Sequence, residues 1–407
     1  MNVSTYEHHL IPVIDFGNQI MTRGTGSYLY DNAGNKYLDL NSGQFCAVLG
    51  HSNAEVTKRL KNSIKRLTHT STSIISDEVV TCSNTLHRIS GAMHAYSILL
   101  STGAEAVEFS LRYAKHIKNK AGVICFDKGY HGLTLGSQSV TFGGVFAIPR
   151  IPDVHIIQIP TEESVTESLG RLEHIMQHNE IAVILLEPIV SVGGMLYPPA
   201  AWFRNVRELC DRYGVLMLLD ECQTGFGRTG NWFAYQTYDF IPDMVATAKG
   251  IGLGYPVSVV LFRDRLMPKR GGFAMTHFSS HQNDPFAAAI VNVGIRYIEE
   301  NNLLLSIQKK AVNFLEQLAA LEKKNHHFIN ARGLGLMFGA DLAFNGVQDY
   351  RPVYKGLYQK MMDRGVIIQG TNGGQALRFL PDYLMDTADW AYACEILHQV
   401  LLTGDFA

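Results

Sequence analysis

The sequence predicts an α/β fold in which helices wrap a mainly parallel sheet, and two observations carry that prediction. Short apolar runs alternate with amphipathic helical stretches through the middle of the chain. Residues 181–187 (IAVILLE) form one such run, and its continuous apolarity is typical of a strand buried on both faces of a sheet. A chain of 407 residues is long enough for one large domain and a smaller one.

The expected elements follow in chain order. A hairpin over 28–40, turning at Asn-Ala-Gly-Asn, comes before the alternating region. The expected strands span 96–101, 122–126, 181–187, 215–220 and 244–248. One expected helix begins at 103, and two others span 161–178 and 199–213. Gly214 is the C-terminal stop of the helix over 199–213. In the C-terminal part, the sequence pattern predicts helices over 285–300, 303–323 and 386–402. GLGLMFGADL and LRFL are expected to be strands.

Composition excludes several classes of protein. The chain has 35 basic and 37 acidic residues, so no electrostatic footprint for nucleic acid is expected. Its six cysteines are scattered without a CxxC pair, which argues against a zinc knuckle, a redox dithiol or a disulfide framework and favours a reducing compartment. No targeting segment is apparent, and no run approaches the roughly 18 apolar residues of a membrane helix. We therefore expect a cytoplasmic protein.

Histidine pairs give no expectation of a metal site. His8-His9 and His326-His327 have neither a helical partner spacing nor a nearby set of carboxylates, so surface histidines are the better interpretation.

Lys249 stands at the end of the apolar run 244–248, in PDMVATAKGIGLGYP. A lysine at the mouth of a buried strand meets the low-dielectric interior, which disfavours the charged form of its amine. Neutral lysine amines form imines with carbonyl compounds. The alternative from this stretch alone is a lysine whose head reaches water.

Other strand ends carry polar groups, and ligands of parallel sheets lie beyond the carboxyl ends of the strands. After 96–101, STGAEA presents the amides of Gly103 and Ala104 at a helix N-terminus, which is either an anion site or a plain helix cap. After 122–126, DKGYHG presents Tyr130 and His131, either to stack on a flat ring or to pack at the surface.

Asp220 ends the apolar strand 215–220, and a carboxylate there requires a partner. The partner could be a protonated ring nitrogen or an arginine such as Arg228. GFGRTG (225–230) matches a dinucleotide-binding pattern, but the following residues lack a helical face and a well-placed acid. An anion cradle, a stacking ring, a carboxylate and a lysine together are what pyridoxal phosphate (PLP) requires.

LLDECQTGFGRTG followed by PDMVATAKGIGLGYP closely resembles the signature of class III aminotransferases, a fold-type I family of PLP enzymes. STGAEA, GYHG, LLEPIV, SSHQNDP and LRFLP fall in the family order, so the resemblance covers roughly residues 25–400. It implies a mainly parallel seven-stranded sheet and a smaller α+β domain. We expect an N-terminal segment (1–49) that packs with the small domain, a large PLP-binding domain (50–290) and a C-terminal small domain (291–407).

The resemblance implies roles by position. Lys249 matches the Schiff-base lysine and Asp220 the partner of the pyridine nitrogen. Gln223 matches the residue near the phenolic oxygen, and the amides of Gly103 and Ala104 match the phosphate cradle.

Further positions complete the implied site. Tyr130 matches the ring-stacking aromatic, with His131 beside it among the cofactor residues, and Glu187 matches a supporting acid. Ser280 matches a hydroxyl that reaches the phosphate of the neighbouring subunit, which implies a homodimer with shared sites. Arg378 matches the arginine that binds the substrate carboxylate, as suits the bidentate geometry of guanidinium.

Two departures affect the expected substrate. Ornithine and 4-aminobutyrate transaminases carry a glutamate that can neutralise the arginine, where this chain has Val192. SGQFCAVLGH, EPIVSVGG and SSHQNDP resemble the dialkylglycine decarboxylase branch, in which the glutamine matched by Gln44 lies beside the scissile carboxylate. That branch usually has serine at the Val192 position and tryptophan at the Tyr130 position.

We therefore expect a PLP-dependent aminotransferase that moves an amino group between a carboxylate-bearing amine or amino acid and a 2-oxo acid. The alternatives are decarboxylation-dependent transamination and amino acid racemisation or epimerisation. A non-catalytic binding protein is disfavoured because Lys249 and Asp220 are both present.

Overall fold

The computed structural model describes residues 11, 13, 17, 19–141, 150–267, 275–404 and 406. Its largest sheet has the strand order β4-β10-β9-β8-β7-β5-β6. The strands are β4 (Tyr96–Leu100), β5 (Gly122–Phe126), β6 (Val154–Ile157), β7 (Ile181–Leu186), β8 (Leu216–Asp220), β9 (Met244–Thr247) and β10 (Ser258–Phe262). Strand β10 runs antiparallel to both of its neighbours, while the β9-β8-β7-β5-β6 pairs are parallel. The predicted α/β fold with a mainly parallel seven-stranded sheet is confirmed.

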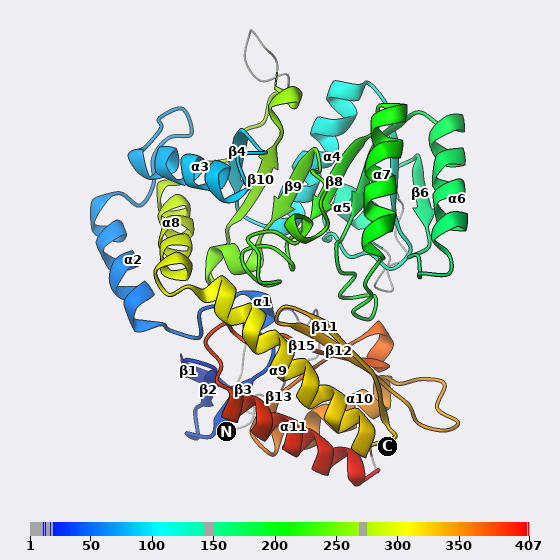
Figure 1. Cartoon of the computed structure of the whole chain (residues 1–407). Coiled ribbons are helices and arrows are strands. Elements are labelled where there is room, and N and C mark those ends of the chain that lie inside the picture. Colours follow the sequence, from blue (N-terminus) through cyan, green and yellow to red (C-terminus); the bar gives the residue numbers. More distant parts are fainter. Residues whose placement is uncertain are drawn as a thin grey trace.

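Burial on both faces explains why these strands are continuously apolar. In β8, Met217 and Leu219 join one hydrophobic cluster while Leu216 and Leu218 join the cluster on the other face. Helices α6 (Val165–His178) and α7 (Ala200–Tyr213) pack on one side of the sheet, and α4 (Gly103–Lys118) packs on the other (Figure 1). A polar residue inside such a strand would be enclosed by both layers, so functional side chains are confined to the strand ends.

A second, smaller layer lies below the large sheet in Figure 1. It contains an antiparallel sheet of order β11-β12-β15-β14, formed by β11 (Phe328–Leu334), β12 (Met337–Leu342), β14 (Gln369–Thr371) and β15 (Ala376–Phe379). Helices α9 (Leu303–Lys324), α10 (Arg351–Met362) and α11 (Thr387–Leu402) accompany it. This arrangement agrees with the predicted smaller α+β part.

The N-terminal strands lie beside the C-terminal part of the chain. Strands β1 (Met21–Thr25), β2 (Tyr28–Asp31) and β3 (Lys36–Asp39) form a sheet with β13 (Val366–Ile367), and β3 pairs with β13 in parallel. The predicted hairpin is confirmed, and the Asp31 carboxylate fixes its turn by accepting hydrogen bonds from the amides of Ala33 and Asn35. The pairing supports the expected packing of the N-terminal segment, whose bounds stay a prediction.

Helix α8 (Pro285–Glu300) packs against α2 (Ala54–Arg66) and α3 (Asp77–Ile89), and α3 also contacts β4. The sequence pattern predicted α8 but neither α2 nor α3. Helix α2 buries only Val56, so its apolar signal is weak. Within the described ranges, no helix is both long enough and apolar enough to cross a membrane.

Candidate functional site

A cavity of about 470 Å³ opens at the carboxyl ends of the parallel strands. Four strand ends supply its walls: residues after β4, after β5, at the end of β8 and after β9. These residues include Ser101, Thr102, Gly103, Ala104, Tyr130, His131, Asp220, Cys222, Ala248 and Lys249. The fold therefore brings together residues that lie nearly 150 positions apart in the chain, as the position of ligands in parallel sheets leads one to expect.

Lys249 follows β9 and is half-buried in this cavity. Its backbone adopts a left-handed conformation, with φ of 52°, which costs free energy for a residue other than glycine. The surrounding fold must hold this conformation in place, and such strain is concentrated at functional sites.

Asp220 is buried at the end of β8 and is held by two hydrogen bonds. The Nδ1 atom of His131 lies 2.8 Å from one carboxylate oxygen, and the amide of Cys222 donates to the other at 3.0 Å. Burial alone would raise the pKa of Asp220, but the hydrogen bond and charge of His131, together with the charge of Lys249, lower it below its usual value. Asp220 is therefore a carboxylate at neutral pH.

The alternative that Arg228 pairs with Asp220 is wrong. Arg228 lies buried in the GFGRTG turn and donates to the backbone carbonyls of Leu336 and Pro381, at 3.1 and 2.5 Å. Its guanidinium thus links this turn to the smaller part of the chain, and the turn serves packing.

Glu187 follows β7 and lies behind the cavity wall. Its carboxylate accepts a hydrogen bond from the amide of Tyr130 at 2.8 Å, which fixes the loop carrying the tyrosine. Burial raises the pKa of Glu187 to about 7, opposed by the charge of His131. The Nε2 atom of His131 is buried and, among the described residues, has no hydrogen-bond partner.

The first turn of α4 forms the opposite wall. Thr102 is the N-cap residue, and its hydroxyl accepts a hydrogen bond from the amide of Glu105 at 3.2 Å. The amides of Gly103 and Ala104 lie at the positive end of a 16-residue helix, where an anion is favoured. Gly132 adopts φ of 123°, and a Cβ there would stand 2.5 Å from the Ala104 Cβ. The GYHG loop can approach the helix this closely because it carries glycine.

Arg378 extends from β15 of the smaller part and is buried. Its guanidinium donates to Gln369 Oε1 and Ser191 Oγ, both at 3.1 Å, so these two partners are neutral. Burial lowers its pKa to about 10, and it remains charged at neutral pH. The ring of Phe45 lies between this cation and Lys249, with its centroid 5.2 Å from Arg378 Cζ and 5.8 Å from Lys249 Nζ.

Some predicted residues lie elsewhere. Gln44, left-handed at φ of 61°, lines a different cavity beside Gln369 and accepts a hydrogen bond from Asn41. Ser280 lies exposed in the turn before α8 and does not line the cavity of its own chain. Val192 is half-buried, and its carbonyl accepts from the amide of Asn372 at 3.2 Å.

Gln223 is buried near the end of β8. Its Oε1 atom has no hydrogen-bond partner among the described residues. A buried amide oxygen without a partner is costly, so this position fits a group that donates or shares a proton from a bound molecule.

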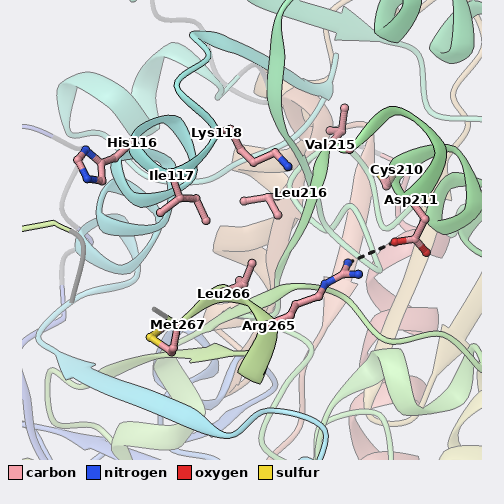
Figure 2. Close-up of a pocket in the computed structure, with 11 residues that line it drawn as sticks. His116, Ile117, Lys118, Cys210, Asp211, Val215, Leu216, Arg265, Leu266 and Met267 are labelled. Carbon is pink, nitrogen blue, oxygen red and sulfur yellow. Dashed lines mark hydrogen bonds and ion pairs between the residues drawn. The ribbon is translucent and has the colours of Figure 1, made fainter. Parts of the chain in front are cut away.

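A larger cavity, of about 580 Å³, lies at the amino end of β8. Figure 2 shows its lining from the end of α4, the start of β8 and the segment after β10. Its charged centre is an ion pair between Arg265 and Asp211, 3.3 Å apart. Helices α4 and α7 both end at this cavity, and its carboxylate, Asp211, is 52% exposed, so we place the candidate site at the carboxyl edge.

Comparison with known proteins identifies the family. Residues 15–401 match the sequence profile of the family described as Aminotransferase class-III. The chain is 31% identical over 396 residues to a [LysW]-aminoadipate semialdehyde/glutamate semialdehyde transaminase of Sulfolobus acidocaldarius, covering 95% of this chain and 96% of that protein. The chain belongs to the class III aminotransferases.

Further similarities agree with that assignment. This aminotransferase is 30% identical over 413 residues to an acetylornithine/succinyldiaminopimelate aminotransferase of Photorhabdus laumondii, covering 98% and 97% of the two chains. A PMP-bound aminotransferase from Vibrio fluvialis shares the fold, with a TM-score of 0.90 and 24% identity over 99% of this chain and 98% of that chain. The expectation of a PLP-dependent aminotransferase is confirmed at the level of the family.

The sequence reading of this aminotransferase missed the residues that support the site. Phe45, Ser191 and Gln369 carry no chemistry-bearing pattern of their own, and the last two accept hydrogen bonds from Arg378. The bond between His131 and Asp220 was also missed, because 89 positions separate the two residues. The signal that the sequence offered for a role of His131 was its position next to Tyr130 at a strand end.

Proposed function

We propose that the cavity at the carboxyl edge binds PLP, with Lys249 as the covalent anchor and Asp220 as the partner of the ring nitrogen. The observation that carries this proposal is the convergence of a half-buried lysine, a buried carboxylate and a helix N-terminus on one cavity. Gly103 and Ala104 would receive the phosphate, and Tyr130 would lie against the ring. The orphaned Oε1 atom of Gln223 fits the phenolic edge.

PLP, when bound through its aldehyde, supplies an electron sink that allows a bond at Cα of an amino acid to break heterolytically. Lys249 then acts as the acid–base group, because its Nζ atom, once free, can take the Cα proton and return it at a neighbouring carbon. One amine serves both proton transfers, so transamination requires no second base in this cavity.

Asp220 keeps a negative charge where the ring nitrogen would lie, which favours a protonated ring. His131 is a positioning residue in this scheme, because its Nδ1 bond holds the Asp220 carboxylate in one orientation. Glu187 holds the Tyr130 backbone in a similar way.

Arg378 supports a substrate with a carboxylate. Among the described residues, the buried guanidinium of Arg378 forms no direct ion pair and donates to two neutral partners, and a substrate carboxylate supplies a counter-charge with bidentate geometry. With Val192 in place of a glutamate, no acid stands at that position to neutralise Arg378 when the substrate changes. We infer that the amino donor and the 2-oxo acid acceptor both present a carboxylate to Arg378.

The position of Gln44 favours proton removal over decarboxylation. The decarboxylase-like alternative needs a polar group that holds the carboxylate perpendicular to the ring plane, and Gln44 lines another cavity here. Supplying 2-aminoisobutyrate, which has no Cα hydrogen, alongside alanine separates the two reactions. We expect keto acid from alanine, whereas rapid CO2 and acetone from 2-aminoisobutyrate would favour the alternative.

We also propose a homodimer with shared sites. Ser280 is exposed and away from its own cavity, as a residue that reaches the partner's phosphate would be. Apolar side chains are exposed nearby, with Phe278 76% exposed, and Leu133 and Tyr255 line the cavity with 48% and 43% of their surface exposed. The six free cysteines support a cytoplasmic location.

Borohydride trapping tests the anchor. The full chain is purified with PLP, treated with sodium borohydride and mapped by peptide mass spectrometry. We expect the label on Lys249, and its loss in Lys249→Ala. Lys118→Ala, which changes a lysine of the cavity in Figure 2, should keep the label. A label on any other lysine would remove Lys249 from this role.

A further inference from the structure

Two histidines and an aspartate form a compact cluster outside the cofactor cavity. His69 lies in the connection between α2 and α3, and His281 and Asp284 lie in the turn before α8. One ligand atom from each residue lies within 4.8 Å of the others. His69 Nδ1 is 2.6 Å and His281 Nδ1 is 3.5 Å from the same oxygen, Asp284 Oδ2. Two imidazoles and a carboxylate thus converge on one point.

We propose that this cluster binds a divalent transition metal ion, with Zn²⁺ as the best match. Imidazole and carboxylate ligands suit Zn²⁺, and a tetrahedral ion with ligands at about 2.0–2.1 Å separates them by roughly 3.3 Å. The separation between His281 and Asp284 already fits. The 2.6 Å between His69 Nδ1 and Asp284 Oδ2 is shorter than this separation, so the imidazole of His69 must move away from the carboxylate for the ion to enter.

Asp284 is positioned for this role by its second oxygen. Asp284 Oδ1 accepts hydrogen bonds from the amides of Phe286 and Ala287 at 3.0 and 3.1 Å, as the N-cap of α8. These bonds orient the buried carboxylate and direct Oδ2 toward the two histidines, in the manner of the groups that support metal ligands in proteins. The positive end of α8 opposes a cation, so we expect micromolar rather than nanomolar affinity.

The composition of the site leaves room for water. Three protein ligands leave a fourth tetrahedral position open. Sequence pattern alone does not predict this site, because His69 and Asp284 lie 215 positions apart. The bound ion would tie the 67–76 connection to the start of α8.

A second histidine pair provides a comparison. His174 and His178 lie one turn apart on α6, with ring centroids 4.2 Å apart, and they can bind metal without a carboxylate. Within the described residues, the cluster at His69 is the one group of three such ligands. The proposal therefore predicts a tighter site at His69 than at His174.

Metal titration tests the proposal. The PLP-loaded full chain, purified without a histidine tag and freed of unbound PLP, is titrated with ZnCl₂ by calorimetry, with Co²⁺ absorption as a second readout. We expect one site per chain with micromolar affinity, weakened about tenfold or more by His69→Ala and by His281→Ala. His116→Ala, which removes an exposed histidine elsewhere, should leave the affinity unchanged.

The same variants also show which histidines bind the zinc ion. Circular dichroism and thermal unfolding without metal confirm that each variant is folded. If zinc affinity is unchanged in the His69 and His281 variants, or is lost only in His174→Ala/His178→Ala, the cluster is a hydrogen-bonded helix cap and the proposal is overturned. Asp284→Asn is not used as the primary test because it also alters the cap of α8.

Discussion

The two cavities at opposite ends of β8 differ more in charge than in size. The larger one, at the amino end, contains an arginine that is paired with acids: Arg265 contacts Asp211 at 3.3 Å and donates from Nε to Asp243 at 2.8 Å. The smaller one, at the carboxyl end, contains Lys249 near a carboxylate that is held by a histidine. The proposed cofactor site is the smaller of the two, so it is the arrangement of charged groups, and not the volume, that distinguishes it.

The difference follows from the direction of the strands. In a parallel sheet, the turns at the carboxyl ends begin helices, so their amides and polar side chains point into a shared crevice. The turns at the amino ends follow helix C-termini, where Gly214 ends α7 and charges pair locally. Substitution of matched residues at the two ends of the sheet therefore tests this difference.

The largest difference between the two ends is expected when the aspartates Asp220 and Asp211 are each replaced by asparagine. Asp220→Asn should lower kcat by on the order of 10²–10³-fold, because the ring nitrogen loses its counter-charge while Asn still accepts hydrogen bonds. Asp211→Asn should change kcat by less than about twofold, since exposed ion pairs contribute little. Steady-state kinetics with bound PLP quantified by absorbance checks both. Equal losses in the two variants would contradict the assignment of the site.

The arginines give a smaller, substrate-dependent effect. Arg378→Lys should raise KM for carboxylate substrates about 10–100-fold, because the bidentate contact to a buried guanidinium is lost. Arg265→Lys, at the other end of the sheet, should leave KM unchanged. Measuring KM for both donor and acceptor sharpens the test, and a change confined to one of them would break the inference that both use Arg378.

Glycines at the two ends should differ in their effect on stability. Gly132→Ala forces a φ of 123° on alanine and places its Cβ against Ala104, so a loss of about 2–3 kcal/mol is expected. In Gly214→Ala, the new Cβ contacts only the Lys118 amine, at 3.7 Å. The expected loss of stability is about 1 kcal/mol and comes mainly from the φ of 65°. Denaturant unfolding of both variants ranks them, and the reverse order would refute the close packing of the GYHG loop.

The pH dependence of stability should differ in sign between the ends. The folded pKa of Glu187 is raised to about 7 by burial, so its folded form holds a proton more tightly, and stability falls as pH rises from about 4.5 to 7. The pKa of Asp243, at the other end, is lowered: burial would raise it, but the charge of Arg207 and the hydrogen bonds from Met217, Arg207 and Arg265 together outweigh burial. Its contribution is therefore lost only as pH falls through and below the usual aspartate range.

Glu187→Gln isolates the first of these effects. Gln keeps the acceptor for the Tyr130 amide but cannot ionise, so the fall in stability between pH 5 and 7.5 should shrink by on the order of 1–2 kcal/mol. Part of the slope should remain, because burial also raises the pKa of Glu221 to about 7. Thermal unfolding across this range measures the slope, and a variant with the wild-type slope would show that Glu187 does not carry it.

Much of this architecture could be predicted from local pattern. Continuous apolar runs predicted β7 and β8, and the polar residues that follow such runs, such as Asp220 and Lys249, marked the carboxyl edge. These inferences succeed because burial on both faces of a sheet leaves few positions for polar side chains.

Partnerships across the chain could not be predicted in this way. The pairing of Asp220 with His131 instead of Arg228, and the seating of Arg378 on Ser191 and Gln369, depend on tertiary contacts between segments far apart in sequence. Gln44 shows the same limit. Its left-handed backbone directs it toward a different cavity, and a matching motif does not reveal that conformation.

The place of β10 has a consequence for synthesis of the chain. Strand β4 is at the edge of the large sheet, and its one partner there is β10. Because β10 comes last of the seven strands in the chain, β4 has no sheet partner until residue 262 has left the ribosome. The turn that carries Gly103 and Ala104 follows β4 directly. A nascent chain that ends before β10 would thus expose the edge of β9 and an unanchored β4, and its cofactor site would be completed late in translation. Chaperones that bind unpaired strand edges would meet this intermediate first.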